Sequence, residues 1–186
     1  MRTPKGKSYC SDLAQLNQYI SGIKLIPCPH CGLTGSLICH SFQRGYAEFG
    51  QEQVIRGRRF FCSNRYRRRG CGRTFAVLLS SVMRRFTVRA KTLWNYLLAV
   101  SNGFSKRAAW QQAQTGFSVQ SGYRLWGKLN QAQPHIRTLL CRIRPPPDSD
   151  SDQPLIQLMQ HLKSVFVSDI CPFESLQTQF QHPLLP

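Results

Sequence analysis

The chain has 186 residues, 41% of them hydrophobic, and a net charge of +17 at pH 7. This length allows one medium domain or two small ones with real cores. The charge is uneven: residues 1–147 hold 24 basic and three acidic side chains, hence +21, whereas residues 148–186 hold one basic and five acidic, hence −4. A body this basic repels itself unless a polyanion neutralises it, and a phosphate backbone is the usual partner.

Composition also argues against a membrane protein and against a disulfide framework. The first residues, MRTPKGKSYC, lack the apolar core of a signal segment, and no apolar run approaches the roughly 20 residues of a membrane span. The chain is therefore expected to be cytoplasmic or nucleoid-associated, with no membrane partner. Eight cysteines in a reducing compartment are poorly explained by disulfides, and metal binding explains four of them better.

Residues 1–23 are predicted to contain a short N-terminal helix. Ser11 is the expected N-cap, apolar side chains then recur at helical spacing, and Gly22 ends the pattern. Residues 24–82 follow as a separate small domain. Its short apolar segments, LIPC, SLICHSF, RRFFC and RTFAVLL, predict an antiparallel sheet around the cysteines. So small a sheet has little core of its own, and a metal is expected to hold it together.

The first cysteine pair forms a Cys-x-x-Cys-Gly knuckle made by Cys28, Cys31 and Gly32. Such a loop turns two thiolates toward one cation, and the glycine permits the positive φ that closes the turn. His30 lies inside this loop and is expected to be an exposed turn residue. The knuckle predicts one half of a structural metal site.

The second pair, Cys62 and Cys71, also ends in Cys-Gly, but eight residues separate its two cysteines instead of two. We interpret SNRYRRRG as the enlarged loop of that knuckle. Four thiolates fill the tetrahedral coordination of Zn²⁺, so the predicted site is closed and structural. Cys39 or His40 in place of Cys62 is the main alternative ligand set.

Arginines crowd the second knuckle, with eight of them inside eighteen residues. The planar guanidinium suits bidentate contacts with phosphate or guanine and also stacks on bases. We therefore predict that a nucleic acid contacts these residues: Arg56, Arg58, Arg59, Arg65, Arg67, Arg68, Arg69 and Arg73.

Residues 83–143 change to a helical period and predict a helix-turn-helix region. A helix in TVRAKTLWNYLLAVSNG is followed by SKRAAWQQA with Ser105 as N-cap, the turn TGFS, and a helix that begins at SVQSGYRLWGKL. Pro134 is expected to kink or restart that last helix. Its inward side is expected to hold Val119, Tyr123, Trp126 and Leu129. Its outward side would read DNA through Gln120, Ser121, Arg124 and Lys128.

The last part of the chain is predicted to be a linker, residues 144–154, and a C-terminal helix with a tail, residues 155–186. The linker RPPPDSDSDQP has nothing to bury. The helix is amphipathic, and its apolar side (residues 155–166) is expected either to dock on a protein partner or second copy, or to pack back on the chain. Residues 171–186 are expected to be weakly ordered.

The segment CPHCG, the intervening hairpin, FFCSN…GCGRTF and the helices after it resemble the zinc-ribbon head of bacterial insertion-sequence transposases. They also resemble the small DNA-binding proteins of short insertion sequences. The resemblance covers roughly residues 24–130. It implies a bacterial protein in which zinc is held by Cys28, Cys31, Cys62 and Cys71. The enlarged second knuckle departs from the short spacing of that family, and the extension after residue 145 matches no part of it.

Together these patterns predict a small α+β protein: a zinc ribbon with a short antiparallel sheet, a helix-turn-helix region and a C-terminal amphipathic helix. No catalytic residues are expected, because the few acidic residues lie mostly in the linker and tail and cannot form a two-metal carboxylate cluster. The predicted function is zinc-dependent binding of double-stranded DNA in the service of a mobile element. The alternatives are an RNA-binding or scaffold subunit of a nucleoprotein complex, and a truncated transposase relic.

Overall fold

Two separate hydrophobic cores divide the chain in the computed structural model, which describes residues 7–46, 48, 50, 52–67, 69–149, 151–167 and 169–185. Unit 1 consists of Met1–Ala47 and Gln51–Ser80, and unit 2 of Glu48–Gly50 and Ser81–Pro186. Unit 1 holds a four-stranded sheet and unit 2 is helical, so the α+β class is confirmed.

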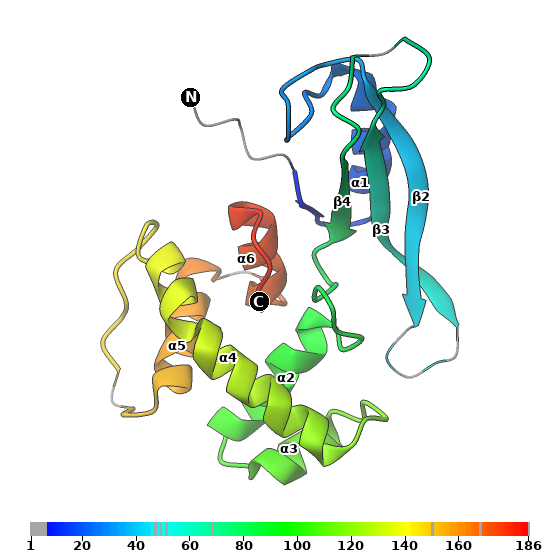
Figure 1. Ribbon diagram of the computed structural model, residues 1–186. Coiled ribbons are helices and arrows are strands. Elements are labelled where there is room, and N and C mark those ends of the chain that lie inside the picture. The colour runs from blue at the N-terminus through cyan, green and yellow to red at the C-terminus, as the bar shows by residue number, and fades with distance from the viewer. Residues whose placement is uncertain are drawn as a thin grey trace. The chain divides into compact units, whose positions relative to one another are not determined.

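The sheet of unit 1 has the strand order β1-β4-β3-β2 (Figure 1). Its strands are β1 (Tyr9–Cys10), β2 (Leu37–Tyr46), β3 (Gln53–Cys62) and β4 (Thr74–Leu79). The predicted antiparallel pairing holds for β2, β3 and β4, but β1 was not predicted and pairs parallel to β4. A two-residue strand carries no periodicity of its own, and only its pairing with a distant segment defines it.

The segment LIPC does not form the strand that its apolar residues predicted. Ile23–Leu25 is a single 3₁₀ turn, η1, and the chain then enters the first cysteine knuckle. The backbone N–H of Cys28 donates to the carbonyl of Leu33, at 3.0 Å, and so does not pair with a strand. Pro27 and Pro29 on either side have no N–H to donate, which also works against a sheet position.

Helix α1 (Leu13–Ser21) packs on the sheet and belongs to unit 1, so it is not the separate element that the sequence suggested. Its N-cap is Asp12 and not Ser11: the Asp12 carboxylate accepts from the backbone N–H of Gln15 at 2.8 Å. Leu16 is fully buried, and Tyr19 meets Phe60 of β3 edge to face at 5.5 Å. The helix therefore supplies part of the core that the sheet lacks.

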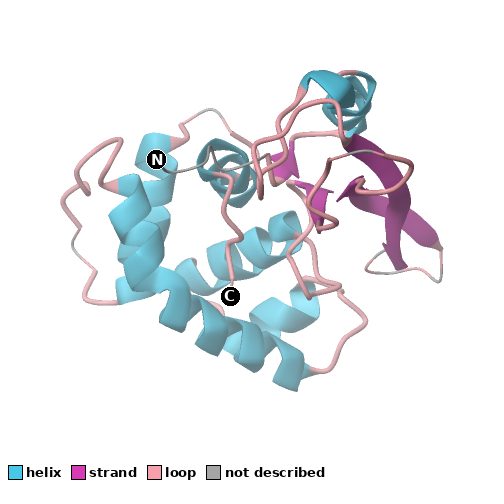
Figure 2. Cartoon of the chain, turned by 45° about the horizontal axis from the view of Figure 1, so that its top comes forward, coloured by secondary structure: helices cyan, strands magenta, loops and turns pink. Residues whose placement is uncertain are grey.

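Unit 2 contains five helices among the described residues, drawn in cyan with α1 in Figure 2. They are α2 (Ala90–Ser101), α3 (Lys106–Gln112), α4 (Val119–Leu140), α5 (Pro154–Val165) and α6 (Pro172–Phe180). Ser105 caps α3 as predicted, accepting from the N–H of Ala108 at 3.2 Å. Helix α4 continues through Pro134, so the predicted restart at this residue is wrong. The proline removes one intrahelical donor, but it is exposed and leaves the turns on either side intact.

The C-terminal segment completes the core of unit 2. The apolar side of α5 is buried in the same cluster as α2, α3 and α4, which matches the expectation that it packs back on the chain. An interaction of this helix with a partner stays a prediction. The tail is not weakly ordered, because it forms α6 and buries Phe173, Leu176, Leu184 and Leu185. Gln177 ties α6 to the end of the chain, since its side-chain oxygen accepts from the N–H of Leu184 at 3.1 Å.

A glycine in α4 provides a test of how the helices of unit 2 pack. A Cβ on Gly122 would meet the indole ring of Trp110 at 2.7 Å, whereas a Cβ on Gly127 of the same helix would meet nothing within 4 Å. Trp110 is itself only 2% exposed and cannot move aside freely. We therefore expect Gly122→Ala to destabilise unit 2 by about 1–3 kcal/mol. We expect Gly127→Ala to stabilise it by up to about 1 kcal/mol, because alanine favours the helix.

Urea unfolding followed by tryptophan fluorescence would measure both effects, since all three tryptophans lie in unit 2. Equal effects of the two substitutions would contradict the close packing of α3 on α4.

Candidate metal centre and basic surface

Four cysteine sulfurs converge in unit 1. The Sγ atoms of Cys28, Cys31, Cys62 and Cys71 all lie within 4.8 Å of one another. The Cys28–Cys71 and Cys31–Cys62 sulfur pairs are each 3.8 Å apart. A tetrahedron with metal–sulfur bonds of about 2.3 Å has edges of about 3.8 Å, so the spacing fits a zinc-sized cation. The structure thus brings together the four predicted ligands in a cluster that could bind a metal ion.

The two knuckles have equivalent backbone hydrogen bonds despite their different lengths. In the first, the N–H of Gly32 donates to the carbonyl of Cys28 at 2.8 Å. In the second, the N–H of Gly72 donates to the carbonyl of Cys62 at 2.9 Å. Both glycines have positive φ, 74° and 71°, as the Cys-Gly pattern predicted. A backbone N–H also points at the first sulfur of each pair, from His30 to Cys28 and from Cys71 to Cys62, each at 3.4 Å.

The arginine-rich segment is therefore an insertion within a knuckle of ordinary geometry. We call residues 63–70 the arginine loop. The N–H of Gly70 donates to the carbonyl of Ser63 at 3.1 Å and closes the loop at its base. A Cβ on Gly70 would lie 2.2 Å from that carbonyl oxygen, so only glycine fits there. Ser63 is in turn held by Ser36, whose carbonyl accepts from it at 2.9 Å.

The alternative ligands lie outside the cluster of four sulfurs. His30 directs its ring toward β4, where Nε2 lies 3.3 Å from the carbonyl oxygen of Thr74. Cys39 packs against the core of unit 1. His40 pairs its Nδ1 with the hydroxyl of Ser41 at 3.2 Å and is exposed. The described geometry thus favours Cys62 over Cys39 or His40 as the third ligand.

The surroundings of the thiols favour different protonation states at different sulfurs. Burial raises the pKa of Cys62 to about 12 and also raises the pKa of Cys28. A hydrogen bond from the backbone of Leu33 lowers the pKa of Cys31 to about 7. At neutral pH a cation must therefore displace a proton at least from Cys62 in order to bind four thiolates.

This displacement predicts a pH dependence of metal affinity. A raised pKa means that the proton competes with the metal, so the affinity should rise as the pH rises. We expect an increase of at least about tenfold for each unit between about pH 6 and about pH 8, for one or more protons released per metal bound. Competition with a chelator of known pH-dependent affinity measures this slope. A slope of zero would show that the thiols are already deprotonated without metal.

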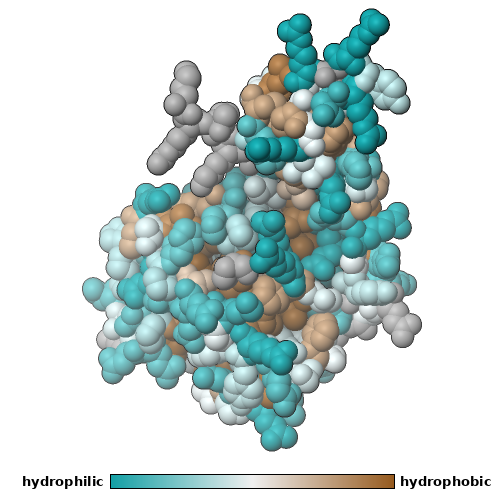
Figure 3. Space-filling view, viewed as in Figure 1, coloured by the Kyte–Doolittle hydropathy of each residue, from teal (hydrophilic) through white to brown (hydrophobic). Residues whose placement is uncertain are grey.

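The described arginines of the loop are exposed to solvent. Arg65, Arg67 and Arg69, here called the loop arginines, are exposed, as is Arg73 directly after the second knuckle. Arg68 lies outside the described residues. Figure 3 shows long hydrophilic side chains projecting from the end of unit 1 that carries this loop, at the top of Figure 1. Unit 1 contains 13 basic and two acidic residues, hence a net charge of +11.

The arginines on β3 do not continue this surface as one row. Arg58 and Arg59 are consecutive in the strand and so point to opposite faces of the sheet. The guanidinium of Arg58 lies over the ring of Phe42, 3.9 Å from its centroid. Arg56 is the extra residue of a bulge, because Gly57 pairs with Gln43 and Ile55 with Arg44. The eight arginines predicted to contact nucleic acid therefore do not all lie on one face of the sheet, and those of the arginine loop lie between Cys62 and Cys71 in the sequence.

Helix α4 exposes two of its four predicted outward residues. Gln120 and Arg124 are exposed, whereas Ser121 and Lys128 are half-buried. The Lys128 ammonium lies over the ring of Phe86, 5.7 Å from its centroid. Ser121 and Lys128 are thus less exposed than the prediction of an outward-facing side requires.

The predicted inward side of α4 needs one correction. Tyr123 was predicted to face inward, but its side chain is 50% exposed. Leu125 is buried and faces inward instead. Because Gly122 allows the indole of Trp110 to lie against the helix, the inward row runs through Gly122, Leu125 and Leu129. Tyr123 is one position away from this row and faces solvent beside Arg124. The spacing of the aromatic residues alone could not reveal this.

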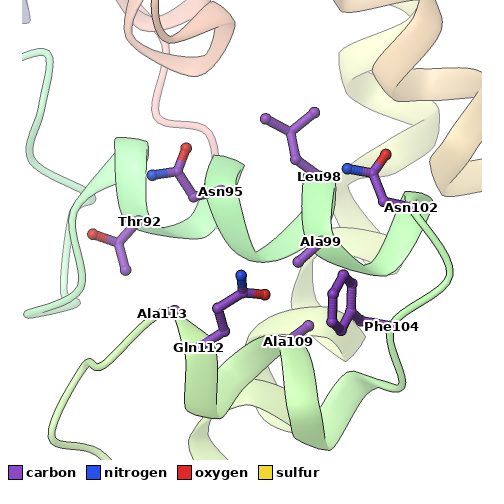
Figure 4. Close-up of a pocket in the computed structure, with 9 residues that line it drawn as sticks. All are labelled: Thr92, Asn95, Leu98, Ala99, Asn102, Phe104, Ala109, Gln112 and Ala113. Carbon is purple, nitrogen blue, oxygen red and sulfur yellow. The ribbon is translucent and has the colours of Figure 1, made fainter.

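Sequence reasoning gave no indication of a pocket between α2 and α3. It has a volume of about 500 Å³ and is drawn in Figure 4. Carboxamides of Asn95, Asn102 and Gln112 line it together with apolar side chains such as Leu98 and Phe104. The described residues that line it carry no charge, so it does not suit a phosphate group.

Comparison of the chain with protein-family models, with curated proteins and with solved structures finds no match. Within the described part of the chain, no helix is both long enough and apolar enough to cross a membrane. The function must therefore be argued from the cysteine cluster and the basic surface alone.

Proposed function

We propose that this chain is a zinc-dependent, non-catalytic DNA-binding protein that acts in the transposition or regulation of a mobile element. The observation that carries the proposal is the insertion of the arginine loop between two of the four clustered cysteines. A metal at this site would fix both ends of the loop. The metal would thus hold the basic surface in a defined conformation.

Zinc is the cation that best suits the cluster. Four thiolates with sulfur pairs 3.8 Å apart match its tetrahedral geometry and its preference for sulfur. Four protein ligands leave no position for a substrate or an activated water, which supports a structural role and not a catalytic one.

Nucleic acid is the partner that best suits the basic surface. Among the described residues, no carboxylate forms a salt bridge with the loop arginines or with Arg73. Their charge is thus available to phosphates, whose counterions would be released on binding. Arginine also offers two parallel donors to a phosphate, which lysine cannot do.

Helix α4 is proposed as the second DNA contact. Helices α2, α3 and α4 follow one another with short connections, as a helix-turn-helix requires. Gln120 and Arg124 are exposed one helical turn apart, and they are residue types that can read adenine and guanine edges. The link to a mobile element rests on the resemblance of the cysteine motifs and the following helices to insertion-sequence proteins.

Metal content and nucleic-acid binding of the purified full-length protein test the proposal. We expect one zinc per chain and an affinity for duplex DNA that falls by about 10³–10⁵ between about 50 and about 200 mM salt, as expected for 6–10 phosphate contacts. A specific target duplex should compete at least about 10³-fold better than random duplex at about 150 mM salt. Structured RNA that outcompetes every duplex would favour the RNA-binding alternative. A metal-free protein with no affinity for either polymer would overturn the proposal.

A further inference from the structure

Tyr66 at the tip of the arginine loop is the most exposed large hydrophobic residue that the structure describes, at 94%. Its backbone has a φ of 51°, and the next residue, Arg67, has a φ of 63°. Residues other than glycine rarely adopt this left-handed conformation, and two in succession form a tight, costly turn. No described residue stacks on the Tyr66 ring or places a cation over it. The core of unit 1 therefore does not account for this aromatic side chain.

The base of the loop is held firmly beneath this tip. Cys62 and Cys71 on either side are predicted metal ligands, and the Ser63–Gly70 hydrogen bond closes the loop between them. The guanidinium of Arg65 lies 5.7 Å from the centroid of the Phe61 ring on β3. A tyrosine side chain has only two rotatable bonds, so holding it in contact with a ligand costs little entropy. The loop thus presents a flat ring between cations on a fixed support.

We infer that Tyr66 stacks on an unpaired nucleobase, so that the protein prefers DNA in which a single-stranded segment adjoins a duplex. This inference rests on the proposed function and names the form of DNA that its surface selects. Stacking of a base on an aromatic side chain contributes about 1–3 kcal/mol. In a closed duplex the faces of each base are covered by the neighbouring base pairs. Separating two stacked base pairs to insert a side chain costs a few kcal/mol, which offsets the free energy gained by stacking. An unpaired base offers its face without that cost.

The neighbours of Tyr66 favour this ligand over a protein. Exposed tyrosines at protein interfaces are typically surrounded by residues that exclude water. Here the described neighbours within the loop are Asn64, Arg65, Arg67 and Arg69, all exposed. Arginines on both sides of a stacking ring are the arrangement found where proteins follow a single strand, with cations on phosphates and an aromatic ring on the base.

The test compares two DNA molecules with the same number of phosphates, one fully paired and one with an unpaired segment of a few nucleotides next to the duplex. Fluorescence anisotropy at about 150 mM salt would give both affinities. For the native protein we expect a preference of about tenfold for the partly unpaired DNA, within the roughly 5- to 150-fold that stacking allows. A 2-aminopurine at the unpaired position should lose fluorescence on binding, because stacking quenches it.

Three variants distinguish the contribution of the Tyr66 ring to binding from the contributions of its neighbours. Tyr66→Leu keeps the bulk and the backbone strain but removes the flat ring, and it should abolish the preference while leaving the affinity for paired duplex within about twofold. Tyr66→Phe should retain the preference, because stacking does not need the hydroxyl. Tyr46→Leu is the matched control, since Tyr46 lies at the end of β2, is 57% exposed and should not matter. Metal content and thermal unfolding would establish that each variant is folded.

Three results would overturn the inference. A native protein that binds paired duplex but shows no preference for unpaired DNA would refute it and leave the proposed function standing, and so would a preference that survives in Tyr66→Leu. Failure to bind any nucleic acid would refute the proposed function together with the inference.

Discussion

Replacing Cys71 with serine is expected to unfold unit 1 while unit 2 remains folded. Among the described residues, the core cluster of unit 1 has eight buried apolar residues, and two of them, Cys28 and Cys62, are predicted metal ligands. Structural zinc contributes about 10–16 kcal/mol in small domains at neutral pH. A core this small cannot replace that amount. Unit 2 has a larger core that includes none of the four ligand cysteines, so it should not depend on the metal.

Hydrogen exchange of the full-length protein distinguishes the two units directly. Amides of β2, β3 and β4 should lose their protection in Cys71→Ser, and those of α2 and α4 should keep it. Tryptophan fluorescence should stay native, because every tryptophan lies in unit 2. Removal of the metal from the native protein with a chelator should give the same pattern.

Cys141→Ser is the matched control for this substitution. Cys141 follows the last turn of α4, is exposed and lies outside the sulfur cluster, so its replacement should leave metal content and protection unchanged. A Cys71→Ser variant that retains both the metal and the protection of the sheet would show that the cluster does not support unit 1.

Neutralising the three loop arginines is expected to have the largest effect on DNA binding. Each phosphate that a basic side chain neutralises contributes about 0.9 to the slope of log affinity against log salt. In the variant Arg65→Gln, Arg67→Gln, Arg69→Gln this slope should therefore fall by about 2.7. The affinity at about 100 mM salt should fall by at least about tenfold for the three substitutions together. A salt titration of duplex binding measures both quantities.

A second triple variant controls for the reduction of charge itself. Arg137→Gln, Arg142→Gln, Lys163→Gln removes the same charge from α4, from the residues just after it and from α5, none of them near the loop in sequence. This variant should retain most of the slope and affinity. If both triple variants weaken binding equally, the whole charge of the protein and not the arginine loop holds the DNA.

The cluster of four cysteines could be predicted from sequence because the information for each knuckle is local. Cys-Gly pairs at Cys31 and Cys71 indicate two turns with positive φ, and the structure has both. The equivalence of the two knuckles was less visible, since it lies in backbone hydrogen bonds that span the insertion. The exposure of Tyr66 could not be predicted from the sequence either, because a tyrosine in this segment could equally well pack in a core or lie in an exposed turn.

The errors in the fold have a common physical cause. Strand β1 exists only through its parallel pairing with β4, and α6 through its burial against α2, so neither has a strong pattern of its own. The position of Tyr123 depends on the contact between Gly122 and Trp110, and these two residues are twelve apart in the sequence. Local periodicity identified most of the helices, but it could not decide which of their residues face a distant partner.

The hydrogen bonds at the two ends of residues 63–70 determine where this protein can tolerate changes in its sequence. The hydrogen bond between Ser63 and Gly70 closes the base of the loop, and the described residues between them form no part of the sheet or its core. Insertions, deletions and exchanges in this segment should therefore be tolerated, in the way that antibody loops vary on a constant framework. A cysteine cluster of this kind can therefore carry loops of many different sequences.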